Sequence, residues 1–407
     1  MQDPRYLTAQ EAADALGIKV ASLYSYVSRG LIRSEETSGK KRTRRYRAED
    51  ITKLKQRKAL KHDPAAIVAD ALNWGAPVLE SALTLIEGGR FYYRGRDVLS
   101  LIDHYTVEQV AALIWTGDLP PDPPALLAHP FDLPPRCAAA FQANRVRLTP
   151  IEAFQVLLPL AAADDVAAYD LRPPAVILTG TRILRLLTAI AAGGQATSGD
   201  MGTVLQRHWA PDRPAAAALI NTALILCADH ELNVSSFTAR CVASAGSTPY
   251  AVVTAGLAAL QGVKHGGYTG RVEALFREVR TAAGARPTLV NRLKRGEPIP
   301  GFRQPLYPQG DPRGKALLER TTAAYPDSPA VALATAITEA MFDLSGDRPT
   351  IDFGLVALAR TLELPPGSAL ALFALGRTIG WLGHAIEQYR SNRLIRPRAR
   401  YIGEQPA

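Results

Sequence analysis

The chain has 407 residues, of which 47% are hydrophobic and 21% charged, and this composition allows more than one buried core. Its first residues (MQDPRYLTAQEA) lack the basic-then-apolar pattern of a secretory signal, and no uncharged apolar run approaches the roughly 20 residues that span a bilayer. We therefore expect a multidomain globular protein of the cytoplasm, and neither a secreted nor a membrane-spanning one.

The net charge of +9 is concentrated at the N-terminus. Residues 1–62 hold 15 Lys and Arg against 7 Asp and Glu, a balance of +8, and the rest of the chain contributes only +1. A basic surface confined to one small domain indicates a polyanionic partner for that domain.

Two short helices are predicted within this basic segment. Thr8 and Glu11 form a capping box, and the helix that follows ends at Gly17. A second helix is predicted over residues 20–29 (VASLYSYVSR). Its apolar positions at helical spacing are Val20, Leu23 and Val27. The polar residues left for another surface include Ser22, Tyr24, Ser25 and Arg29.

Residues 33–47 are expected to form a two-stranded wing that turns at a glycine. The wing carries a run of cations, namely Lys40, Lys41, Arg42, Arg44, Arg45 and Arg47. Over about 60 residues this segment resembles the winged helix-turn-helix domains of mercury-resistance-type regulators and phage excisionases. The resemblance implies that the second helix enters the major groove of double-stranded DNA, while the wing lies on the phosphate backbone. A solvated charged loop is the alternative interpretation of the same run.

The candidate DNA-contacting residues therefore come from both parts of this domain. They are Ser22, Tyr24, Ser25, Arg29, Lys40, Lys41, Arg42, Arg44 and Arg45.

Beyond the wing the pattern is almost entirely helical, so the fold class is mainly α. Residues 50–61 read as a further basic helix that breaks at Asp63-Pro64. A hairpin is predicted over residues 83–98, and residues 119–135, with seven prolines, are predicted to be an irregular surface loop. The three cysteines are scattered, without the close pairs of a zinc or redox site, so no metal is expected.

A series of polar motifs lies in the C-terminal half. In chain order they are Asp229-His230-Glu231, Lys264-His265-Gly266-Gly267, Asp311-Pro312-Arg313, Thr350-Ile351-Asp352, Gly376-Arg377 and Arg396-Pro397. Each motif alone is weak, because a lone histidine is usually structural and a lone arginine usually forms an ordinary ion pair. Together, two histidines, one aspartate and three arginines suit a reaction in which a carbanion forms beside a dianionic acid.

From about residue 66 to residue 403 the chain resembles the citrate synthase family of acyl-CoA condensing enzymes. The resemblance includes residues 92–95 (YYRG), 107–120 (VEQVAALIWTGDLP), 228–244 (ADHELNVSSFTARCVAS) and 395–398 (IRPR). It implies an all-α body behind the helix-turn-helix domain, which occupies residues 1–62. A large domain would comprise residues 66–265 and 367–407, and a small domain residues 266–366. The family also works as homodimers, with the last arginine, here Arg396, donated across the interface.

The chemistry assigns a role to each group. The methyl proton of an acyl thioester is weakly acidic, so a carboxylate must remove it while a donor holds the thioester oxygen. Asp352 fits the base, and His265, kept neutral, fits the donor. By resemblance the acceptor is a 2-oxo dicarboxylate such as oxaloacetate, which suits bidentate guanidinium groups. Its predicted ligands are Arg313, Arg377, Arg396 and His230.

Acetyl-CoA enters as a co-substrate, and no bound cofactor is expected. The loop that holds Ile299, Gly301 and Phe302 resembles the stretch where relatives bind the adenine of coenzyme A. Backbone groups would provide most of that binding.

One position departs from the family in a way that bears on catalysis. Gln304 stands where the family has the histidine that polarises the ketone of the acceptor. A glutamine amide can still donate a neutral hydrogen bond. Two hypotheses for the function of the protein follow. It is a condensing enzyme that carries a DNA-binding domain, or a transcription regulator whose body senses acyl-CoA or di- or tricarboxylates. A helical scaffold with a relic pocket is a third.

Overall fold

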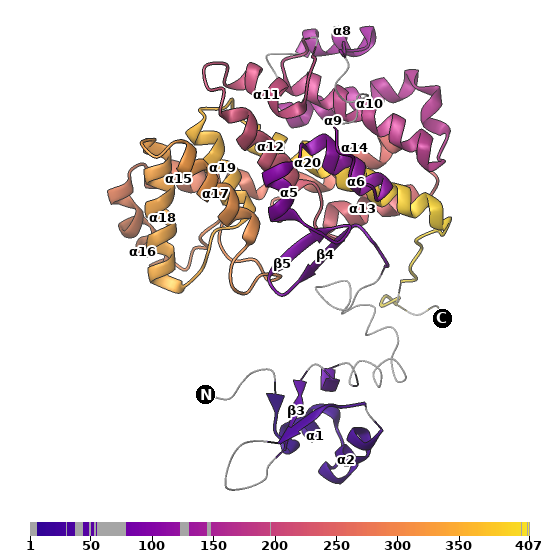
Figure 1. Ribbon diagram of the computed structural model, residues 1–407, viewed down its shortest axis with the longest axis vertical. Helices are drawn as coiled ribbons and strands as arrows, with labels where there is room; N and C mark the ends of the chain where they lie inside the picture. Colours follow the sequence, from indigo (N-terminus) through magenta and orange to yellow (C-terminus); the bar gives the residue numbers. More distant parts are fainter. Residues whose placement is uncertain are drawn as a thin grey trace. The chain divides into compact units, whose positions relative to one another are not determined.

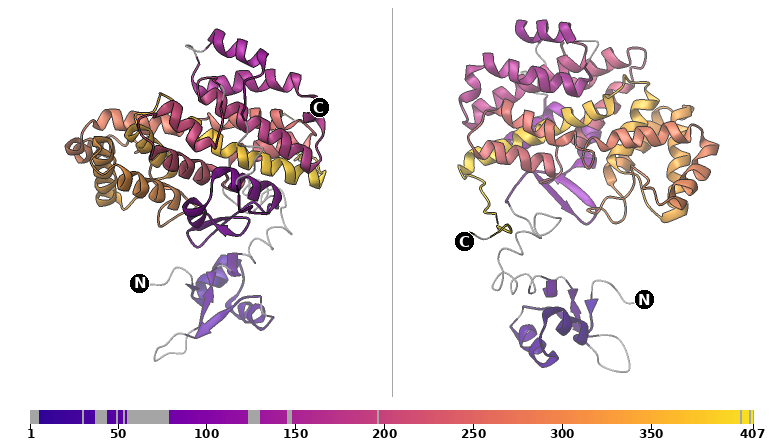
Figure 2. Two further views of the ribbon diagram at one scale, coloured as in Figure 1. Left: turned by 45° about the horizontal axis from the view of Figure 1, so that its top comes forward. Right: turned by 180° about the vertical axis from the view of Figure 1, so that it is seen from behind.

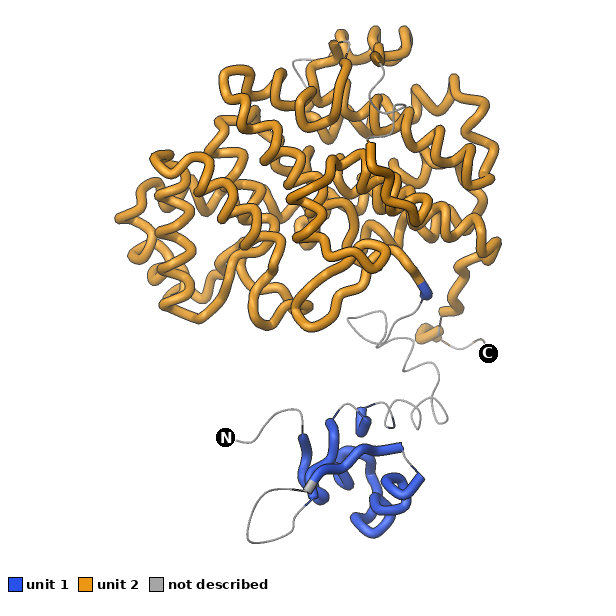
Figure 3. The backbone as a smooth tube through the Cα atoms, in the orientation of Figure 1, with its two compact units in different colours: residues 1–80 blue, residues 81–407 orange. Residues whose placement is uncertain are grey.

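The computed structural model describes residues 6–29, 31–36, 44–48, 50–52, 54, 79–122, 130–144, 148–195, 197–399, 401–404 and 406 (Figures 1 and 2). The chain forms two compact units, residues 1–80 and 81–407 (Figure 3). Each unit has its own hydrophobic core. The predicted fold class, mainly α with an N-terminal winged helix-turn-helix, is confirmed.

The first unit begins as the sequence predicted. Its elements are β1 (Tyr6–Leu7), α1 (Ala9–Leu16), α2 (Val20–Ser28), β2 (Ser34–Glu36) and β3 (Arg44–Arg47). The capping box of α1 is present, because the Thr8 hydroxyl accepts the Glu11 N–H and the Glu11 carboxylate accepts the Thr8 N–H at 2.8 Å. Gly17 ends α1 with φ +60°, a conformation that favours glycine.

In the described residues, the two strands of the wing and β1 form a three-stranded antiparallel sheet in the order β1-β3-β2. The sequence predicted β2 and β3 but missed β1, which pairs Tyr6 with Arg47 across the sheet. Leu23, Ile32 and Tyr46 form the buried centre. Of the three apolar positions predicted for α2, only Leu23 is fully buried, while Val20 and Val27 are half-buried.

The predicted hairpin at residues 83–98 is confirmed and gains a third strand. It consists of β4 (Thr84–Glu87), β5 (Arg90–Tyr93) and β6 (Arg96–Asp97), all antiparallel. The proline-rich segment is irregular where it is described, and α8 begins at its last proline, Pro135. Most of the basic helix predicted over residues 50–61 lies outside the described residues.

Helices make up nearly all of the rest of the second unit. They are α5 (Val98–His104), α6 (Val107–Thr116), α8 (Pro135–Asn144), α9 (Pro150–Asp164), η1 (Val166–Tyr169), α10 (Pro173–Ala191), α11 (Met201–Trp209), α12 (Ala216–Cys227), α13 (Val234–Ser244), α14 (Pro249–Leu260), α15 (Tyr268–Val279), η2 (Ala282–Gly284), α16 (Ala285–Lys294), α17 (Pro312–Ala324), α18 (Pro329–Ser345), α19 (Ile351–Thr361) and α20 (Ser368–Ser391).

Helix α20 runs through the middle of this body (Figure 2) and contacts α6, α10, α12, α13 and α14. It packs closely against the end of α12 because Gly376 and Gly380 face it. A Cβ at Gly376 would lie 2.5 Å from the Leu224 carbonyl oxygen, and one at Gly380 would lie 2.4 Å from that of Ala228. This close approach brings Arg377 against the C-terminus of α12.

Two helices of the described part, α10 and α20, are long and apolar enough to cross a membrane by length and composition. The most apolar window of α20 is 89% buried inside the protein, and that of α10 is 67% buried. Their apolar character is therefore explained by packing in a helical core.

The second unit contains two hydrophobic clusters, and α19 lies between them. Ile351, Leu355 and Leu358 of α19 belong to the larger cluster. Phe353 and Val356 belong to the smaller one, which is built from α15, α16, α18 and the residues around Phe302. Asp352, between Ile351 and Phe353, therefore lies where the two clusters meet.

Candidate active site

The Asp229-His230 pair lies in the turn between α12 and α13, and its two side chains have different surroundings. Asp229 is completely buried, accepts a hydrogen bond from the Thr84 hydroxyl at 2.5 Å, and has an oxygen 3.2 Å from Nε2 of His384. Asp229 therefore joins the turn to β4 and α20. His230 is 6% exposed, and its Nε2 lies 2.9 Å from the hydroxyl oxygen of Tyr307.

His265 is held by a serine at the start of α13. Its Nε2 is 2.8 Å from Oγ of Ser235, and Nε1–H of Trp381 donates to the same Oγ at 3.1 Å. Oγ also donates to Oδ1 of Asn233 at 2.7 Å, an oxygen that accepts the backbone N–H groups of Ser235 and Ser236 as well. Because Nε2 of His265 is held by Oγ, Nδ1 is the ring nitrogen left to contact a substrate.

Both histidines are held neutral. Burial, and then the positive charge of Arg377, lower the pKa of His265 to about 3. Burial and the charges of Arg313 and Arg377 place the pKa of His230 well below its usual range. A neutral His265 is the form that can donate a hydrogen bond without already carrying a charge.

Arg313 is 2% exposed and forms a bidentate pair with Asp311, with Nε at 2.9 Å and Nη2 at 2.8 Å from the two carboxylate oxygens. The same carboxylate accepts the backbone N–H groups of Arg313 and Ile351. One side chain thus fixes a guanidinium and joins the N-termini of α17 and α19.

Arg377, 1% exposed, is not neutralised in the same way. Its Nε–H donates to the Cys227 carbonyl at 2.8 Å, while Nη2 is buried and has no hydrogen-bond partner among the described residues. Burial, the largest effect, lowers the pKa of Arg377, and the neighbouring charge of Arg313 acts in the same direction. The carboxylate of Asp229 opposes this shift. Two buried guanidinium groups, one of them with an Nη2 that lacks a hydrogen-bond partner among the described residues, suit the binding of an anion.

Asp352 lies at the start of α19, and burial raises the pKa of its carboxyl from the ordinary 3.8 to about 7. Asp311 acts in the same direction, whereas Arg313 opposes it. Oδ1 of Asp352 is buried without a hydrogen-bond partner in the described part of the chain. A carboxyl that titrates near neutral pH and has a free oxygen suits a general base.

Charge connects these groups into one cluster. Arg377 acts on both histidines, Arg313 acts on His230 and Asp352, and the two arginines act on each other. The structure thus brings together five residues that the sequence singled out, namely His230, His265, Arg313, Asp352 and Arg377.

The predicted coenzyme A loop lies beside the base. Gly301 has φ +90°, and its carbonyl accepts the N–H of Thr350, two residues before Asp352, at 2.8 Å. Phe302 forms a β-bridge with Pro349, and both Ile299 and Phe302 are buried in the smaller cluster.

Two predicted site residues, Gln304 and Arg396, have side chains with no contact to this cluster within the described part of the chain. Gln304 is half-buried, and its Oε1 accepts the N–H of Leu306 at 3.4 Å. Arg396 is exposed in the segment after α20. The preceding residue, Ile395, bonds to Ser244 at the far end of α13 from Ser235, roughly 14 Å along that helix.

The candidate DNA-contacting residues divide into three groups. Ser22, Tyr24 and Arg29 are exposed on α2, while Ser25 is half-buried and its hydroxyl accepts from Arg29 at 3.3 Å. Arg44 is exposed on β3, whereas Arg45 stacks over Tyr6 at 4.1 Å and pairs with Glu35. Lys40, Lys41 and Arg42 lie outside the described residues.

Sequence reasoning missed two residues that contact the cluster, Ser235 and Tyr307, and a third, Trp381, that donates to Ser235. Ser235 lay inside a quoted motif without a role. Tyr307 is the only aromatic residue between Gln304 and Asp311, which was the available signal for a side chain turned inward.

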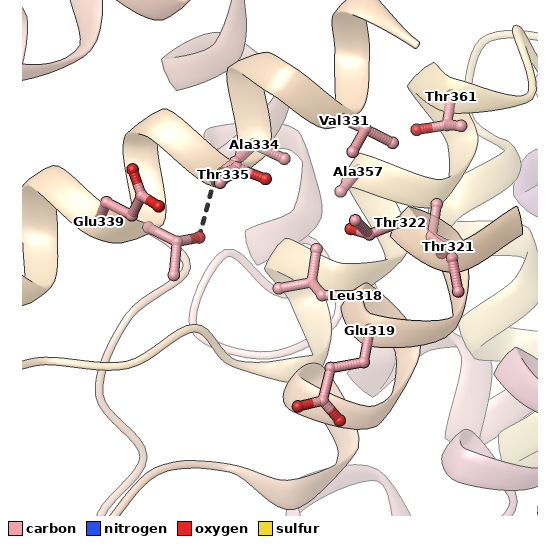
Figure 4. A pocket seen from close by; sticks show the side chains of 12 residues that line it. Leu318, Glu319, Thr321, Thr322, Val331, Ala334, Thr335, Glu339, Ala357 and Thr361 are labelled. Atoms are coloured by element: carbon pink, nitrogen blue, oxygen red, sulfur yellow. Dashed lines mark hydrogen bonds between the residues drawn. The ribbon is translucent and has the colours of Figure 1, made fainter. Parts of the chain in front are cut away.

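Two cavities lie elsewhere in the second unit. One, of about 380 Å³, is lined by apolar, threonine and glutamate side chains of α17, α18 and α19 (Figure 4). The other, of about 990 Å³, is lined by α15, α18, α19 and residues 363–370. Neither is lined by the five clustered residues. In the described part of the chain no group of histidine, cysteine and acidic side chains could hold a metal ion.

Comparison with known proteins identifies both units. The family model for the citrate synthase C-terminal domain matches residues 71–398, and a helix-turn-helix domain model matches residues 6–59. The citrate synthase of Haloferax volcanii is 30% identical over 81% of this chain and 95% of its own length. The 2-methylcitrate synthase of Shewanella oneidensis is 27% identical over 80% of this chain and 93% of its own length.

Solved structures agree. Citrate synthase from Thermotoga maritima matches with a TM-score of 0.71 and 25% identity over 82% of this chain and 95% of that one. The Thermoplasma acidophilum enzyme, in a ternary complex with carboxymethyl coenzyme A and oxaloacetate, has the same fold, with a TM-score of 0.70, 23% identity and the same coverage. The fold and cluster define a helical synthase-type body joined to a helix-turn-helix domain. The chain belongs to the citrate synthase family.

Removing the carboxylate of Asp311 should destabilise the protein strongly. Asp311→Ala leaves Arg313 buried without its counter-ion, and we expect the free energy of unfolding to fall by about 3–5 kcal/mol. The measurement is urea unfolding followed by circular dichroism.

The matched control is Asp347→Ala. Asp347 also forms a bidentate pair, with Arg303, but that arginine side chain is 75% exposed. Its loss should cost about 1 kcal/mol or less. Equal effects of the two substitutions would contradict the importance assigned to burial.

Proposed function

We propose that this protein condenses an acyl-CoA, such as acetyl-CoA, with oxaloacetate or a similar 2-oxo acid to give citrate or a homologue and free coenzyme A. The observation that carries the proposal is the pair of buried guanidinium groups, one of them with an Nη2 that has no hydrogen-bond partner in the described part of the chain, beside a carboxyl with a pKa near 7. An anionic acceptor satisfies the first feature, and abstraction of a proton from carbon uses the second.

The proposed sequence of steps begins at the thioester. Asp352 removes a proton from the carbon next to the thioester carbonyl, while Nδ1–H of His265 donates to the thioester oxygen as the enol forms. The enol carbon then attacks the ketone carbon of the acceptor. Water hydrolyses the resulting thioester and releases coenzyme A.

The acceptor is held through its carboxylates. Arg313 and Arg377 bind them from within the chain, with His230 as a neutral hydrogen-bonding partner. Arg396, exposed in its own chain, completes the site of a second subunit in a homodimer. The coenzyme A moiety lies against Ile299, Gly301 and Phe302, and the protein acts in the cytoplasm without a bound cofactor.

The same proposal includes binding of double-stranded DNA by the first unit. The exposed polar face of α2 would enter the major groove, and the basic wing, including Lys40, Lys41 and Arg42, would lie on the phosphates.

A second function is favoured by a specific observation, the replacement of the ketone-polarising histidine by Gln304 in a chain with a helix-turn-helix domain. In that case the body senses an acyl-CoA or a di- or tricarboxylate, with little or no catalysis, and its occupancy changes DNA binding.

Turnover should require Asp352. Purified protein with acetyl-CoA and oxaloacetate is expected to release free thiol, and Asp352→Asn should lower kcat by about 10²–10⁴-fold because the base is lost. Thiol release is followed with a chromogenic reagent. Asp343→Asn, at an exposed carboxylate of α18, serves as the control.

The sensor function has the opposite signature. It predicts no thiol release with any 2-oxo acid, together with an affinity for DNA that changes when acyl-CoA or a dicarboxylate is added. That pair of results would refute the condensing activity.

The pH profile should report Asp352. Only the ionised carboxylate accepts a proton, so with a pKa of about 7 we expect kcat/KM to rise about tenfold per pH unit below pH 7 and to level off above it. His265, with a pKa of about 3, stays neutral throughout and adds no second limb. Steady-state rates between pH 5.5 and 9 test this, and a level profile from pH 5.5 to 7 would exclude Asp352 as the base.

Contact with phosphates predicts a salt-dependent affinity for DNA. For Arg29→Ala and for Arg44→Ala we expect the slope of log K against log salt to become shallower by about 0.9 each. Fluorescence anisotropy with labelled duplex DNA measures the slope. Arg172→Ala, at an exposed arginine of the second unit, should leave it unchanged. Unchanged slopes for both first-unit variants would refute the phosphate contacts.

A further inference from the structure

The acceptor side of the cluster contains a hydroxyl group to which the family resemblance assigns no role. Tyr307 is 2% exposed, and its hydroxyl lies 2.9 Å from Nε2 of His230. The two rings have centroids 5.6 Å apart, and Cζ of Arg313 lies 5.7 Å from the centre of the Tyr307 ring. The phenol therefore lies among the groups proposed to hold the acceptor.

The loop that carries Tyr307 also carries Gln304, and the two residues are in different surroundings. The Gln304 carbonyl accepts the N–H of Tyr307 at 2.9 Å, which closes a turn. Within that turn Gln304 is half-buried with its amide oxygen directed to Leu306, whereas Tyr307 is buried against His230. The ketone of the acceptor needs a donor, and the buried phenol is better placed than the amide.

We propose that the hydroxyl of Tyr307 donates a hydrogen bond to the ketone oxygen of the acceptor, and then the proton, in place of the histidine missing at position 304. This inference rests on the proposed condensing function and names a further catalytic residue for it. In the free protein the hydroxyl lies 2.9 Å from Nε2 of the neutral His230, which accepts the O–H in the tautomer that carries its proton on Nδ1. A hydroxyl rotates readily to a new acceptor.

The step balances in protons and electrons. As the enol carbon bonds to the ketone carbon, the enol oxygen returns its proton to Nδ1 of His265 and the thioester carbonyl forms again, while the π pair of the ketone C=O moves onto the ketone oxygen. The alkoxide takes the proton of Tyr307 and becomes the tertiary hydroxyl of the product. The proton held by Asp352 passes to solvent, and solvent returns one to the phenolate.

The surroundings of Tyr307 suit this role. Burial raises the pKa of Tyr307, so the phenol keeps its proton at neutral pH until an alkoxide, a stronger base, forms beside it. The charges of Arg313 and Arg377 favour the phenolate that results.

Tyr307→Phe removes the hydroxyl and keeps the ring. We expect kcat to fall by about 10²–10³-fold, the usual loss for one oxyanion donor, with an unchanged KM for acetyl-CoA. Gln304→Ala should lower kcat less. Tyr325→Phe is the matched control, because Tyr325 also lies beneath an arginine, Arg213, and is outside the cluster.

A spectroscopic measurement separates catalysis from support of His230. Oxaloacetate labelled with ¹³C at the ketone is bound to each variant, and the carbonyl resonance is recorded. A donor withdraws electrons from the ketone carbon, so the bound resonance should lie downfield of the free one in the original protein. In Tyr307→Phe it should return towards the free position.

Several results would overturn the assignment. Gln304 would be the donor if Gln304→Ala lost both kcat and the carbonyl shift while Tyr307→Phe lost neither. A raised KM for oxaloacetate with an unaltered shift in Tyr307→Phe would reduce Tyr307 to support of His230. A bound ketone that is unshifted in the original protein would also exclude a donor.

Failure of the proposed function is distinguishable from these results. If oxaloacetate binds with a shifted carbonyl but no thiol is released, condensation is refuted while the shift in Tyr307→Phe still decides the donor. If oxaloacetate does not bind at all, both proposals are refuted.

Exchange of the acetyl-CoA methyl protons with deuterated water should persist in Tyr307→Phe, because that half-reaction uses Asp352 and His265.

Discussion

The carboxylate of Asp311 is the contact on which the arrangement of the site depends. It receives four N–H groups, two from the guanidinium of Arg313 and two from the backbones of Arg313 and Ile351. The backbone bonds cap α17 and α19 together, so the positions of Arg313 and Asp352 are set by one group. An anion at two helix N-termini is also electrostatically favourable, which offsets part of the cost of burying it.

The same burial decides the protonation of the surrounding groups. In a water-exposed site two arginines would hold a nearby carboxyl ionised, yet the pKa of Asp352 is raised to about 7, because loss of solvent outweighs the attraction of Arg313. The histidines are neutral for the corresponding reason, since burial and the charge of Arg377 lower both pKa values, and the charge of Arg313 lowers that of His230 further. The neutral histidines and the raised pKa of Asp352 therefore share a single cause.

The sequence predicted the features that depend on local patterns. The capping box at Thr8, the hairpin after residue 83 and the mainly helical body follow from spacing and propensity, and all are found. Four of the five site residues lie at or beside helix ends, as Asp352 does at the start of α19, whereas Arg377 lies within α20. What escaped prediction depends on contacts between distant segments, such as the pairing of β1 with β3 and the bond between His230 and Tyr307, which are 77 residues apart. No sequence pattern encodes which side chain of an irregular loop turns inward.

The backbone of the loop before Asp311 is held in place largely by contacts of its own main chain. Gly301 and Arg303 both have positive φ, and for arginine this conformation costs about 1 kcal/mol. The exposed pair between Arg303 and Asp347 offsets little of that cost. The loop is held instead by the bonds from Thr350 to the Gly301 carbonyl and by the bridge of Phe302 to Pro349. These bonds use backbone acceptors, whereas the side chain of residue 304 adds only the bond of 3.4 Å from the Leu306 N–H, so most of the loop's hydrogen bonding does not depend on which residue stands at position 304.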